Sequence, residues 1–548
     1  MSLPNDLRTT LKQAKSEGQL TEGLAALSTF TRQFDDMDQQ KAHYWLGLND
    51  LKSREAADAF YDSLAAPIHR HDQIAYAKFL YFSGDPIAAR HILNDVSDLG
   101  PMASELAQSA DNQVNVMTEF ALSAPGEIAA TLFTEARRTM RQINGHGCLF
   151  YTGQLGPGGA EGQFAKTAVA FQTNGTVGPI SVAVRHLDPR KNAAFHLPTL
   201  TDAGITPFAV CEAKAAVLAL PPKISALLAA LPRDLIHPVT ALAQHLKKRA
   251  PQSVFLWQDG GVLIGALAAS LAGVPNILTS FRGLPPNIRP NLHRPEYLPV
   301  YRALVKDRQA TLSANNTATA QAYSDWLGEG PTALKTIPNA ISTPSISANH
   351  KTKTLWHKIK SQSQTCTQTV IGVFRIQAVK QPELWFETAL QTIKARPDIR
   401  FIHVGPGDVP LALERQIQTE GKDHIFRIGL SSDVGFWINK SDIMMHLARF
   451  EGLPNALAEA HLLGCPILAT PAGGTSEVVI EGQTGRLLPD TQPQTDLVKA
   501  VLLDLLDQPN LLDAYGKAAQ KHTKAVFDPD RVYRQMATYL GPPTRDAA

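Results

Sequence analysis

The chain has 548 residues, enough for several domains, and its 52 basic and 50 acidic residues give a net charge of +2. This balance excludes the strong net charge that favours binding to nucleic acid or to an anionic membrane. With 44% hydrophobic and 19% charged residues, the composition is typical of a globular protein. The longest apolar run, 262–274, is too short to span a bilayer, and the first residues lack the pattern of a signal peptide. We therefore expect a cytoplasmic protein, with peripheral contact at the inner face of the membrane left open.

Residues 1–140 are predicted to be all-helical, because they contain few glycines or prolines and no strand-like run. Adjacent alanines recur at 25–26, 56–57 and 88–89, and small residues at a fixed place allow paired helices to approach closely. A period near 34 residues is typical of tetratricopeptide-type repeats. We predict a helical-repeat region that binds a protein partner or serves packing. A plain helical bundle is the alternative.

From about residue 145 the pattern changes to strands that alternate with helices. The first series of short apolar runs lies at 147–152, 254–257, 276–279 and 310–313, and the second at 370–374, 401–404, 425–428, 443–445 and 466–468. Such alternation predicts α/β structure with parallel, doubly wound sheets. A polar stretch near 341–369 separates the two series. We therefore expect Rossmann-like domains over 145–345 and 346–527, followed by a terminal helical segment over 528–548.

The most informative stretch is RFEGLPNALAEA at 449–460, in which Glu451 and Glu459 bracket seven residues. A glycine and a proline mark the change from loop to helix, because proline is tolerated in a helix's first turn. Three amides there would lack intrahelical partners and could bind a phosphate at the positive end of the helix dipole. They belong to Asn455, Ala456 and Leu457. Two acids on either side of a phosphate would suit the hydroxyls of a nucleotide sugar. Taken alone, the two glutamates could equally belong to an amphipathic surface helix.

A glycine pair follows the next expected strand, in PAGGTSE at 471–477. Gly473 and Gly474 would let the backbone approach a ligand closely. The order and spacing from Glu451 to a further glycine turn at 481–485 resemble the donor half of the family 4 retaining glycosyltransferases of GT-B fold. The resemblance covers about 145–540. It implies two Rossmann-like domains that face a cleft, with the acceptor at the first domain, a nucleotide-sugar donor at the second, and a terminal helix that returns to the first domain.

The resemblance assigns roles to residues of the second domain. Arg375 and Lys380 lie five residues apart after an expected strand, at the sheet edge where ligands bind, and match the family's Arg-and-Lys motif. These cations would stabilise the leaving diphosphate without a metal. Glu451 would bind the donor sugar and orient the anomeric centre, Glu459 would bind the ribose, and the glycine pair would close around the donor. A pair of surface charges is the alternative for the two cations.

In the first domain, the loop after the first strand resembles the family's glycine loop, so Gly158 and Gly159 would line the cleft. The family often has an arginine where this chain has Gly162, so contacts of that arginine do not carry over. Many relatives have a histidine where this chain has Gln258, and glutamine cannot take up a proton. In the family's usual front-face mechanism the leaving phosphate is the base. Gln258 could bind a sugar hydroxyl and Asp259 could hold the acceptor, with capping of a strand end as the alternative for both.

A proline-rich loop at 280–297 carries Arg282, Arg289 and Arg294. Prolines make this loop stiff, and planar guanidinium groups would suit an acceptor that bears a carboxylate or phosphate. Together with the residues around Gln258, the loop is similar to the branch of family 4 that includes the Vi-capsule glycosyltransferase. That similarity implies capsule, exopolysaccharide or glycolipid assembly. A solvated, packed loop is the alternative.

No metal site is expected. Four cysteines lie far apart without metal-ligand spacing and are expected to be buried free thiols in a reducing compartment: Cys148, Cys211, Cys366 and Cys465. Two Asp-x-Asp motifs, at 36–38 and 528–530, fall at expected helix starts, where capping explains them. Three histidines are expected to be core residues: His403, His446 and His461. We predict no cofactor, since the nucleotide sugar is a substrate.

The sequence favours a metal-independent retaining glycosyltransferase that uses a nucleotide sugar, with a UDP-sugar as the expected donor. Two alternatives stay open. One is a nucleotide-sugar 2-epimerase on the same fold. The motifs that contain Glu451, Arg375 and Lys380 argue against it. The other is a non-catalytic helical-repeat scaffold with a degenerate glycosyltransferase unit, to which Gly162 and Gln258 point.

Overall fold

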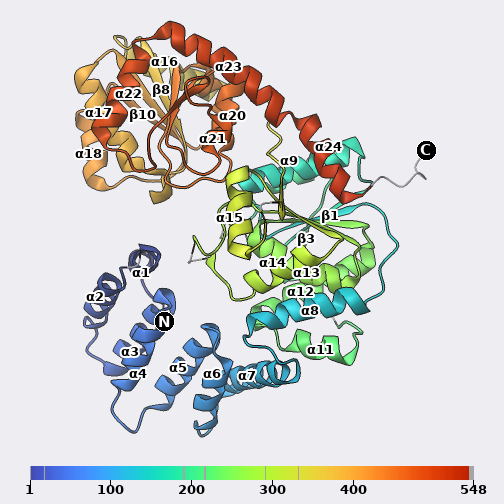
Figure 1. Ribbon diagram of the computed structural model, residues 1–548. Helices are drawn as coiled ribbons and strands as arrows, with labels where there is room; N and C mark the ends of the chain where they lie inside the picture. Colours follow the sequence, from blue (N-terminus) through green and yellow to red (C-terminus); the bar gives the residue numbers. More distant parts are fainter. Residues whose placement is uncertain are drawn as a thin grey trace.

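The computed structural model describes residues 2–17, 19–188, 192–214, 217–289, 292–330 and 332–541. It has an N-terminal group of helices and two α/β units, each built on a parallel sheet (Figure 1). Within the described ranges, no helix is long and apolar enough to cross a membrane.

The N-terminal region is all-helical, as predicted. Its helices are α1 (Asn5–Glu17), α2 (Leu20–Thr31), α3 (Met37–Leu51), α4 (Arg54–Asp62), α5 (Arg70–Phe82), α6 (Pro86–Asn94) and α7 (Pro101–Glu119). They enclose two small cores of their own, one around Trp45 and Phe79 and one around Leu27 and Leu51. Small residues permit close approach, because a Cβ on Gly47 would stand 2.2 Å from the Leu27 side chain. The tetratricopeptide assignment stays a prediction.

The next helix, α8 (Gly126–Thr139), packs into the core of the first sheet instead of the helical region. Leu132 and Phe133 are buried there. Arg137 fixes the helix in place by an ion pair with Asp307, with Nε and Oδ2 2.6 Å apart, and by a hydrogen bond to the carbonyl of Val274. The sequence grouped α8 with the preceding helices because an amphipathic pattern does not tell which neighbour it will cover.

The first sheet has seven parallel strands in the order β3-β2-β1-β4-β5-β6-β7. The strands are β1 (Cys148–Thr152), β2 (Ile180–Val184), β3 (Phe208–Ala209), β4 (Ser253–Trp257), β5 (Asn276–Ser280), β6 (Ala310–Ala314) and β7 (Leu334–Thr336). The helices are α9 (Gly159–Asn174), α10 (Leu197–Thr201), α11 (Pro222–Ala229), α12 (Arg233–Arg249), α13 (Gln258–Ala272), α14 (Tyr297–Lys306) and α15 (Thr317–Leu327). The strand order reverses between β1 and β4, which creates a crevice at their carboxyl ends, where ligands bind in such sheets.

The second sheet has six parallel strands in the order β10-β9-β8-β11-β12-β13, the same winding. The strands are β8 (Gln368–Val373), β9 (Ile399–Val404), β10 (Ile425–Gly429), β11 (Ile443–His446), β12 (Ile467–Ala469) and β13 (Gly485–Leu487). The helices are α16 (His350–Gln362), α17 (Pro382–Ala395), α18 (Leu411–Thr419), α19 (Val434–Asn439), α20 (Asn455–Leu462), α21 (Thr475–Val478), α22 (Thr495–Leu506) and α23 (Pro509–Phe527). The prediction of two parallel, doubly wound sheets is therefore confirmed.

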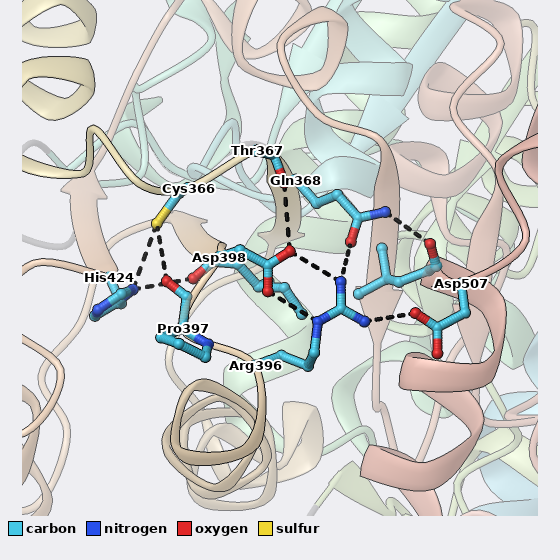
Figure 2. Close-up of polar contacts among 10 residues, drawn as sticks. Cys366, Thr367, Gln368, Arg396, Pro397, Asp398, His424 and Asp507 are labelled. Carbon is cyan, nitrogen blue, oxygen red and sulfur yellow. Dashed lines mark hydrogen bonds and ion pairs between the residues drawn. The ribbon is translucent and has the colours of Figure 1, made fainter.

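An ion-pair network joins the ends of α17 and α22 (Figure 2). Arg396 donates to both carboxylate oxygens of Asp398, at 2.8 and 2.9 Å, and reaches Asp507 at the end of α22. The hydrogen bond from Arg396 lowers the pKa of Asp398 to about 2. The network therefore stabilises the side of the second domain where both helices end.

Beside this network, the Sγ of Cys366 lies 3.4 Å from Nδ1 of His424 (Figure 2). Burial raises the pKa of the Cys366 thiol, which keeps the sulfur protonated and unreactive. All four cysteines are free, and three are buried as expected. The expectation is wrong for Cys211, which is exposed.

The chain crosses between the two α/β domains twice, at neighbouring places. The first crossing follows β7, and the second follows α23, where α24 (Pro529–Leu540) returns to the first domain beside α9 (Figure 1). Side chains of α24 are buried in that domain's core: Val532, Met536 and Leu540. The N–H of Ile341 in the first crossing donates to the carbonyl of Phe527 in the second at 3.0 Å. Asp528 caps α24 as predicted, whereas 542–548 lie outside the described residues.

Candidate active site

The facing carboxyl edges of the two sheets enclose a cleft of about 390 Å³. Its first-domain wall consists of the loop before α9, the start of α13 and the loop after β5. The second-domain wall consists of the loop after β8, the end of β11 and the start of α20. The cleft brings together many of the predicted residues: Gly158, Gly159, Gln258, Arg282, Arg375, Lys380, Glu451, Asn455 and Ala456.

Glu451 lies in the cleft wall between two basic side chains. Its Oε1 accepts a hydrogen bond from Nζ of Lys380 and lies 2.6 Å from Nε2 of His446. The carboxylate is 9% exposed, and burial opposes its ionisation, but the charge of Lys380 and the contact with His446 outweigh burial and lower its pKa to about 2. Glu451 is therefore ionised at neutral pH. Its Oε2 has no hydrogen-bond partner among the described residues and can accept from a ligand hydroxyl.

His446 is a residue of this site that the sequence interpretation missed. His446 is buried, as predicted for a core histidine, but β11 ends at this residue and its side chain also lines the cleft against Glu451. The available signal was its position at the carboxyl end of a parallel strand, five residues before Glu451. His403 and His461 are fully buried, as predicted.

The start of α20 faces the cleft. Asn455 and Ala456 line it, and within the described part of the chain their backbone N–H groups have no hydrogen-bond partner. Leu457 differs from the prediction, because its N–H donates to the carbonyl of Pro454 at 3.1 Å and its side chain is fully buried. Two amides, not three, are therefore available to an anion at this helix end.

Arg375 and Lys380 are placed differently. Arg375 is exposed on the loop after β8, and no ion pair or hydrogen bond of its side chain exists among the residues that the structure describes. The ammonium group of Lys380 is engaged by Glu451. Arg375 can therefore meet a diphosphate directly, whereas Lys380 first serves to neutralise Glu451.

The glycine pair packs against the Glu451 loop and does not line the cleft. The N–H of Gly474 donates to the carbonyl of Gly452 at 2.8 Å, and a Cβ at Gly474 would stand 2.5 Å from that oxygen. Gly473 has φ +51°, and its Cβ would stand 2.0 Å from the carbonyl oxygen of Glu451. The close backbone approach that the sequence predicted is therefore made to the loop that carries Glu451.

Glu459 lies on the second turn of α20 and is not among the residues that line the cleft. The side chain is half-buried, and burial raises its pKa although Lys166 of α9 opposes this effect. The structure thus places Glu459 at the boundary with the first domain. Its contact with a ribose stays a prediction.

The first-domain wall is built around Gln258. This residue begins α13, with φ +63°, and its Nε2 donates to Oε1 of Glu161 at 3.2 Å. Gly158 leaves room for Glu161, since a Cβ there would stand 1.9 Å from Oε2. His196 lies 3.0 Å from where a Cβ on Gly162 would stand. His196 thus occupies the space beside the position at which the family often has an arginine.

Asp259 points away from the cleft into a buried polar cluster. Its carboxylate accepts from the hydroxyls of Tyr323 at 2.6 Å and Tyr301 at 3.2 Å, and from Nη2 of Arg289 at 2.9 Å. Burial raises the pKa of Asp259, against the charge of Arg289. This placement argues against the acceptor contacts predicted for Asp259 and Arg289, because the two side chains already form an ion pair with each other.

Arg294 lies near the N-terminal helices, in a pocket that Tyr81 and Phe82 of α5 also line. Its Nη1 is 2.6 Å from Asp234, and its Nε is 3.0 Å from Glu296. The structure does not bring Arg294 to the cleft, which argues against its predicted acceptor role. Its ion pairs instead fix the far end of the proline-rich loop.

Arg282 is the arginine of this loop that does line the cleft. Its guanidinium stacks on Trp257, with Cζ 4.1 Å from the ring centroid, and donates to Oγ of Ser280 at 3.0 Å. It also donates to Oδ1 of Asn339, whose Nδ2 donates to Oδ1 of Asn455 across the cleft. Burial lowers the pKa of Arg282 to about 9. Asn339, which the sequence interpretation did not single out, thus links the two walls.

Known proteins resemble this chain in sequence and in fold. A family model described as "Glycosyl transferases group 1" matches residues 357–522. The chain is 30% identical over 525 residues to the "Vi polysaccharide biosynthesis protein VipC/TviE" of Salmonella typhi, which covers 88% of each protein. The crystal structure of Anabaena Alr3699/HepE in complex with UDP-glucose superposes with a TM-score of 0.55 at 19% identity, over 72% of this chain and 98% of that chain. WaaG, a glycosyltransferase involved in lipopolysaccharide biosynthesis, superposes with a TM-score of 0.51 at 14% identity, over 72% and 99%.

Two facing, doubly wound sheets with a cleft between their carboxyl edges define the GT-B fold, which the HepE structure shares. The predicted fold class is therefore confirmed. The chain belongs to the group 1 glycosyl transferases, in the branch of the Vi polysaccharide biosynthesis protein. The resemblance to that capsular branch, drawn from a few loops, is confirmed as well.

Proposed function

We propose that the protein is a retaining glycosyltransferase of polysaccharide biosynthesis that moves a sugar from a UDP-sugar to a glycan or glycolipid acceptor. The observation that carries the proposal is the ionised Glu451, held by Lys380 and His446 beside the free amides of α20 and the free guanidinium of Arg375. A carboxylate oxygen suits sugar hydroxyls, whereas amides and a guanidinium suit a diphosphate. The site thus fits both halves of a nucleotide sugar.

Similar proteins support a UDP-sugar as the donor and polysaccharide biosynthesis as the process. The Anabaena HepE structures are complexes with UDP, UDP-glucose, and UDP and glucose. An Escherichia coli relative, 24% identical over 249 residues, is a "UDP-Gal:alpha-D-GlcNAc-diphosphoundecaprenol alpha-1,3-galactosyltransferase". The Salmonella relative belongs to Vi polysaccharide biosynthesis. These relatives favour a UDP-sugar donor and an acceptor in polysaccharide assembly.

In the proposed reaction, the acceptor hydroxyl attacks the anomeric carbon on the face from which the diphosphate leaves. The bond from the anomeric carbon to the diphosphate oxygen breaks with both electrons on that oxygen, and the acceptor oxygen takes its place. The hydroxyl proton passes to the leaving phosphate, since Gln258 cannot take it up. Arg375 and the α20 amides stabilise the charge on the diphosphate, and Glu451 orients the donor sugar. The proposal is metal-independent because these groups supply the positive charge.

The test measures nucleotide binding and turnover with the same proteins. Thermal unfolding with millimolar UDP, GDP and ADP should show selective stabilisation by UDP, because a ligand at about 100 times its Kd adds about 2.7 kcal/mol to the native state. Arg375→Gln should weaken UDP binding about tenfold or more. Arg415→Gln, which removes an exposed arginine of α18, is the matched control.

Glu451→Gln should retain UDP binding and lower sugar transfer to host glycan by about 100-fold. Unchanged transfer by Glu451→Gln would favour the scaffold alternative. A changed sugar nucleotide formed without acceptor would favour the 2-epimerase. Absence of stabilisation by every nucleotide would contradict the donor assignment.

A further inference from the structure

The guanidinium of Arg282 is a cation that no carboxylate of the described residues contacts directly, although the charge of Glu161 on the same wall favours its charged form. Its hydrogen bonds go to the neutral side chains of Ser280 and Asn339, and its Nε is buried without a partner. Within the described ranges, no carboxylate makes an ion pair with it. Arg289 and Arg294 of the same loop each have carboxylate partners. Arg282 therefore differs from its neighbours in being unpaired.

The surroundings of Arg282 hold this charge in a fixed orientation. Trp257 covers one face of the planar group, and the bonds to Ser280 and Asn339 fix its rotation. A guanidinium arranged in this way presents its remaining N–H groups at fixed positions, the geometry that recognises carboxylate and phosphate oxygens. A partly buried charge without a partner is costly, and that cost is recovered when a ligand supplies the opposite charge.

The position of Arg282 in the cleft indicates which ligand supplies the opposite charge. Arg282 belongs to the first-domain wall with Gln258 and Glu161. The donor diphosphate already has Arg375 and the amides of α20 on the second-domain wall. Glu161 acts on Arg282 by its charge but forms no ion pair with it, and its Oε1 accepts a hydrogen bond from Nε2 of Gln258 at 3.2 Å.

We propose that Arg282 binds an anionic group, a carboxylate or a phosphate, that the acceptor carries close to the hydroxyl to be glycosylated. This inference rests on the proposed function, because it names the acceptor class of the same cleft. A carboxylate would belong to an acidic glycan and a phosphate to a phosphate-linked glycan. Both present oxygens that match the guanidinium.

The test uses the full-length protein saturated with UDP and three sugar probes: glucose, glucuronate and glucose 1-phosphate. We expect one or both anionic probes to raise the thermal midpoint of the UDP complex at constant ionic strength, and glucose to leave it unchanged. A response to glucuronate alone indicates a carboxylate, and a response to glucose 1-phosphate alone indicates a phosphate. Arg282→Gln should lose the shift, and Arg282→Lys should retain only part of it, because lysine keeps the charge without the planar fork. Arg308→Gln, an exposed arginine of the first domain, should retain all of it.

The UDP response separates this inference from the proposed function. Normal UDP binding by Arg282→Gln, with loss of the anionic-probe shift, supports an acceptor role and shows that the variant has folded. Loss of UDP binding equal to that of Arg375→Gln would assign Arg282 to the donor and overturn the inference, while the proposed function would stand. Equal shifts with glucose and glucuronate, or no shift with any probe in the wild type, would also overturn it. Failure of the wild type to bind UDP would remove the proposed function and this inference together.

Discussion

Glu451 keeps its charge in a buried position because Lys380 and His446 face it. Its pKa is about 2 in the folded protein, against an ordinary value of 4.5. The stability that this ionised group contributes is therefore complete above its ordinary pKa and is lost as the pH falls toward its folded-state pKa. In Lys380→Met the share of that contribution that Lys380 supplies is missing, so the deficit in thermal midpoint relative to the wild type should shrink from about pH 6 to about pH 3.

Calorimetry at several pH values measures this deficit. The control is Lys394→Met, which breaks an exposed ion pair with Glu420 and should have little effect at any pH. A deficit of Lys380→Met that stays constant across the range would contradict the coupling between Lys380 and Glu451.

The individual side chains also show what the sequence can predict. Glu451, Arg375 and Gly158 lie in the cleft as expected, because each sits where a parallel strand or its following loop ends. His446 and Asn339 were missed, because their roles depend on contacts with Glu451 and Arg282 that no local pattern contains. The same holds for the partners that Asp259 and Arg294 find away from the cleft.

At the scale of elements, the loop that carries Glu451 is shaped by the loop that follows β12. Gly474→Ala would bring a Cβ within 2.5 Å of the Gly452 carbonyl and 2.9 Å of Asn316, so the Glu451 loop must move. A displacement of about 1 Å can lower a rate about 100-fold, and we expect a loss of that order in kcat/KM. Gly330→Ala is the control, since nothing lies within 4 Å of its Cβ and its φ is not positive. Equal activity of both variants in a sugar-transfer assay would contradict this account.

The sequence predicted two parallel sheets, but it missed the strands β2, β3, β7 and β13 and could not show the neighbours of each element. The alternation of apolar runs and helical patterns predicted both sheets, because buried parallel strands have a recognisable composition. It could not show that α8 covers the first sheet, or that Gly473 and Gly474 pack on the Glu451 loop. Those contacts depend on side chains that are far apart in the sequence.

At the scale of the whole molecule, Glu477 of α21 joins the second domain to the first. Its Oε1 accepts from the N–H groups of Thr317 at 2.5 Å and Ala318 at 3.4 Å, at the positive end of α15 in the first domain. Glu477→Gln removes the charge and keeps the size, so the domains should separate more often. We expect a larger radius of gyration in small-angle scattering without nucleotide and a several-fold higher KM for the donor.

Glu481→Gln is the matched control for Glu477, because Glu481 pairs with Arg486 inside the second domain. Saturating UDP should bring the radius of gyration of Glu477→Gln back toward that of the wild type, since a diphosphate held by Arg375 and the α20 amides would lie opposite Gly158 and Gly159 of the first domain. An unchanged radius without nucleotide would show that Glu477 does not control domain closure.

The two crossings between the domains, bonded to each other between Ile341 and Phe527, restrict how the cleft can open. A single tether would let the second domain tilt, twist or swing in any direction. Two chain segments that cross at one place and are joined there leave mainly rotation about an axis through that place. The anomeric carbon of a bound donor would then approach the acceptor along one arc, and its angle of approach would be set by the hinge before any substrate arrives.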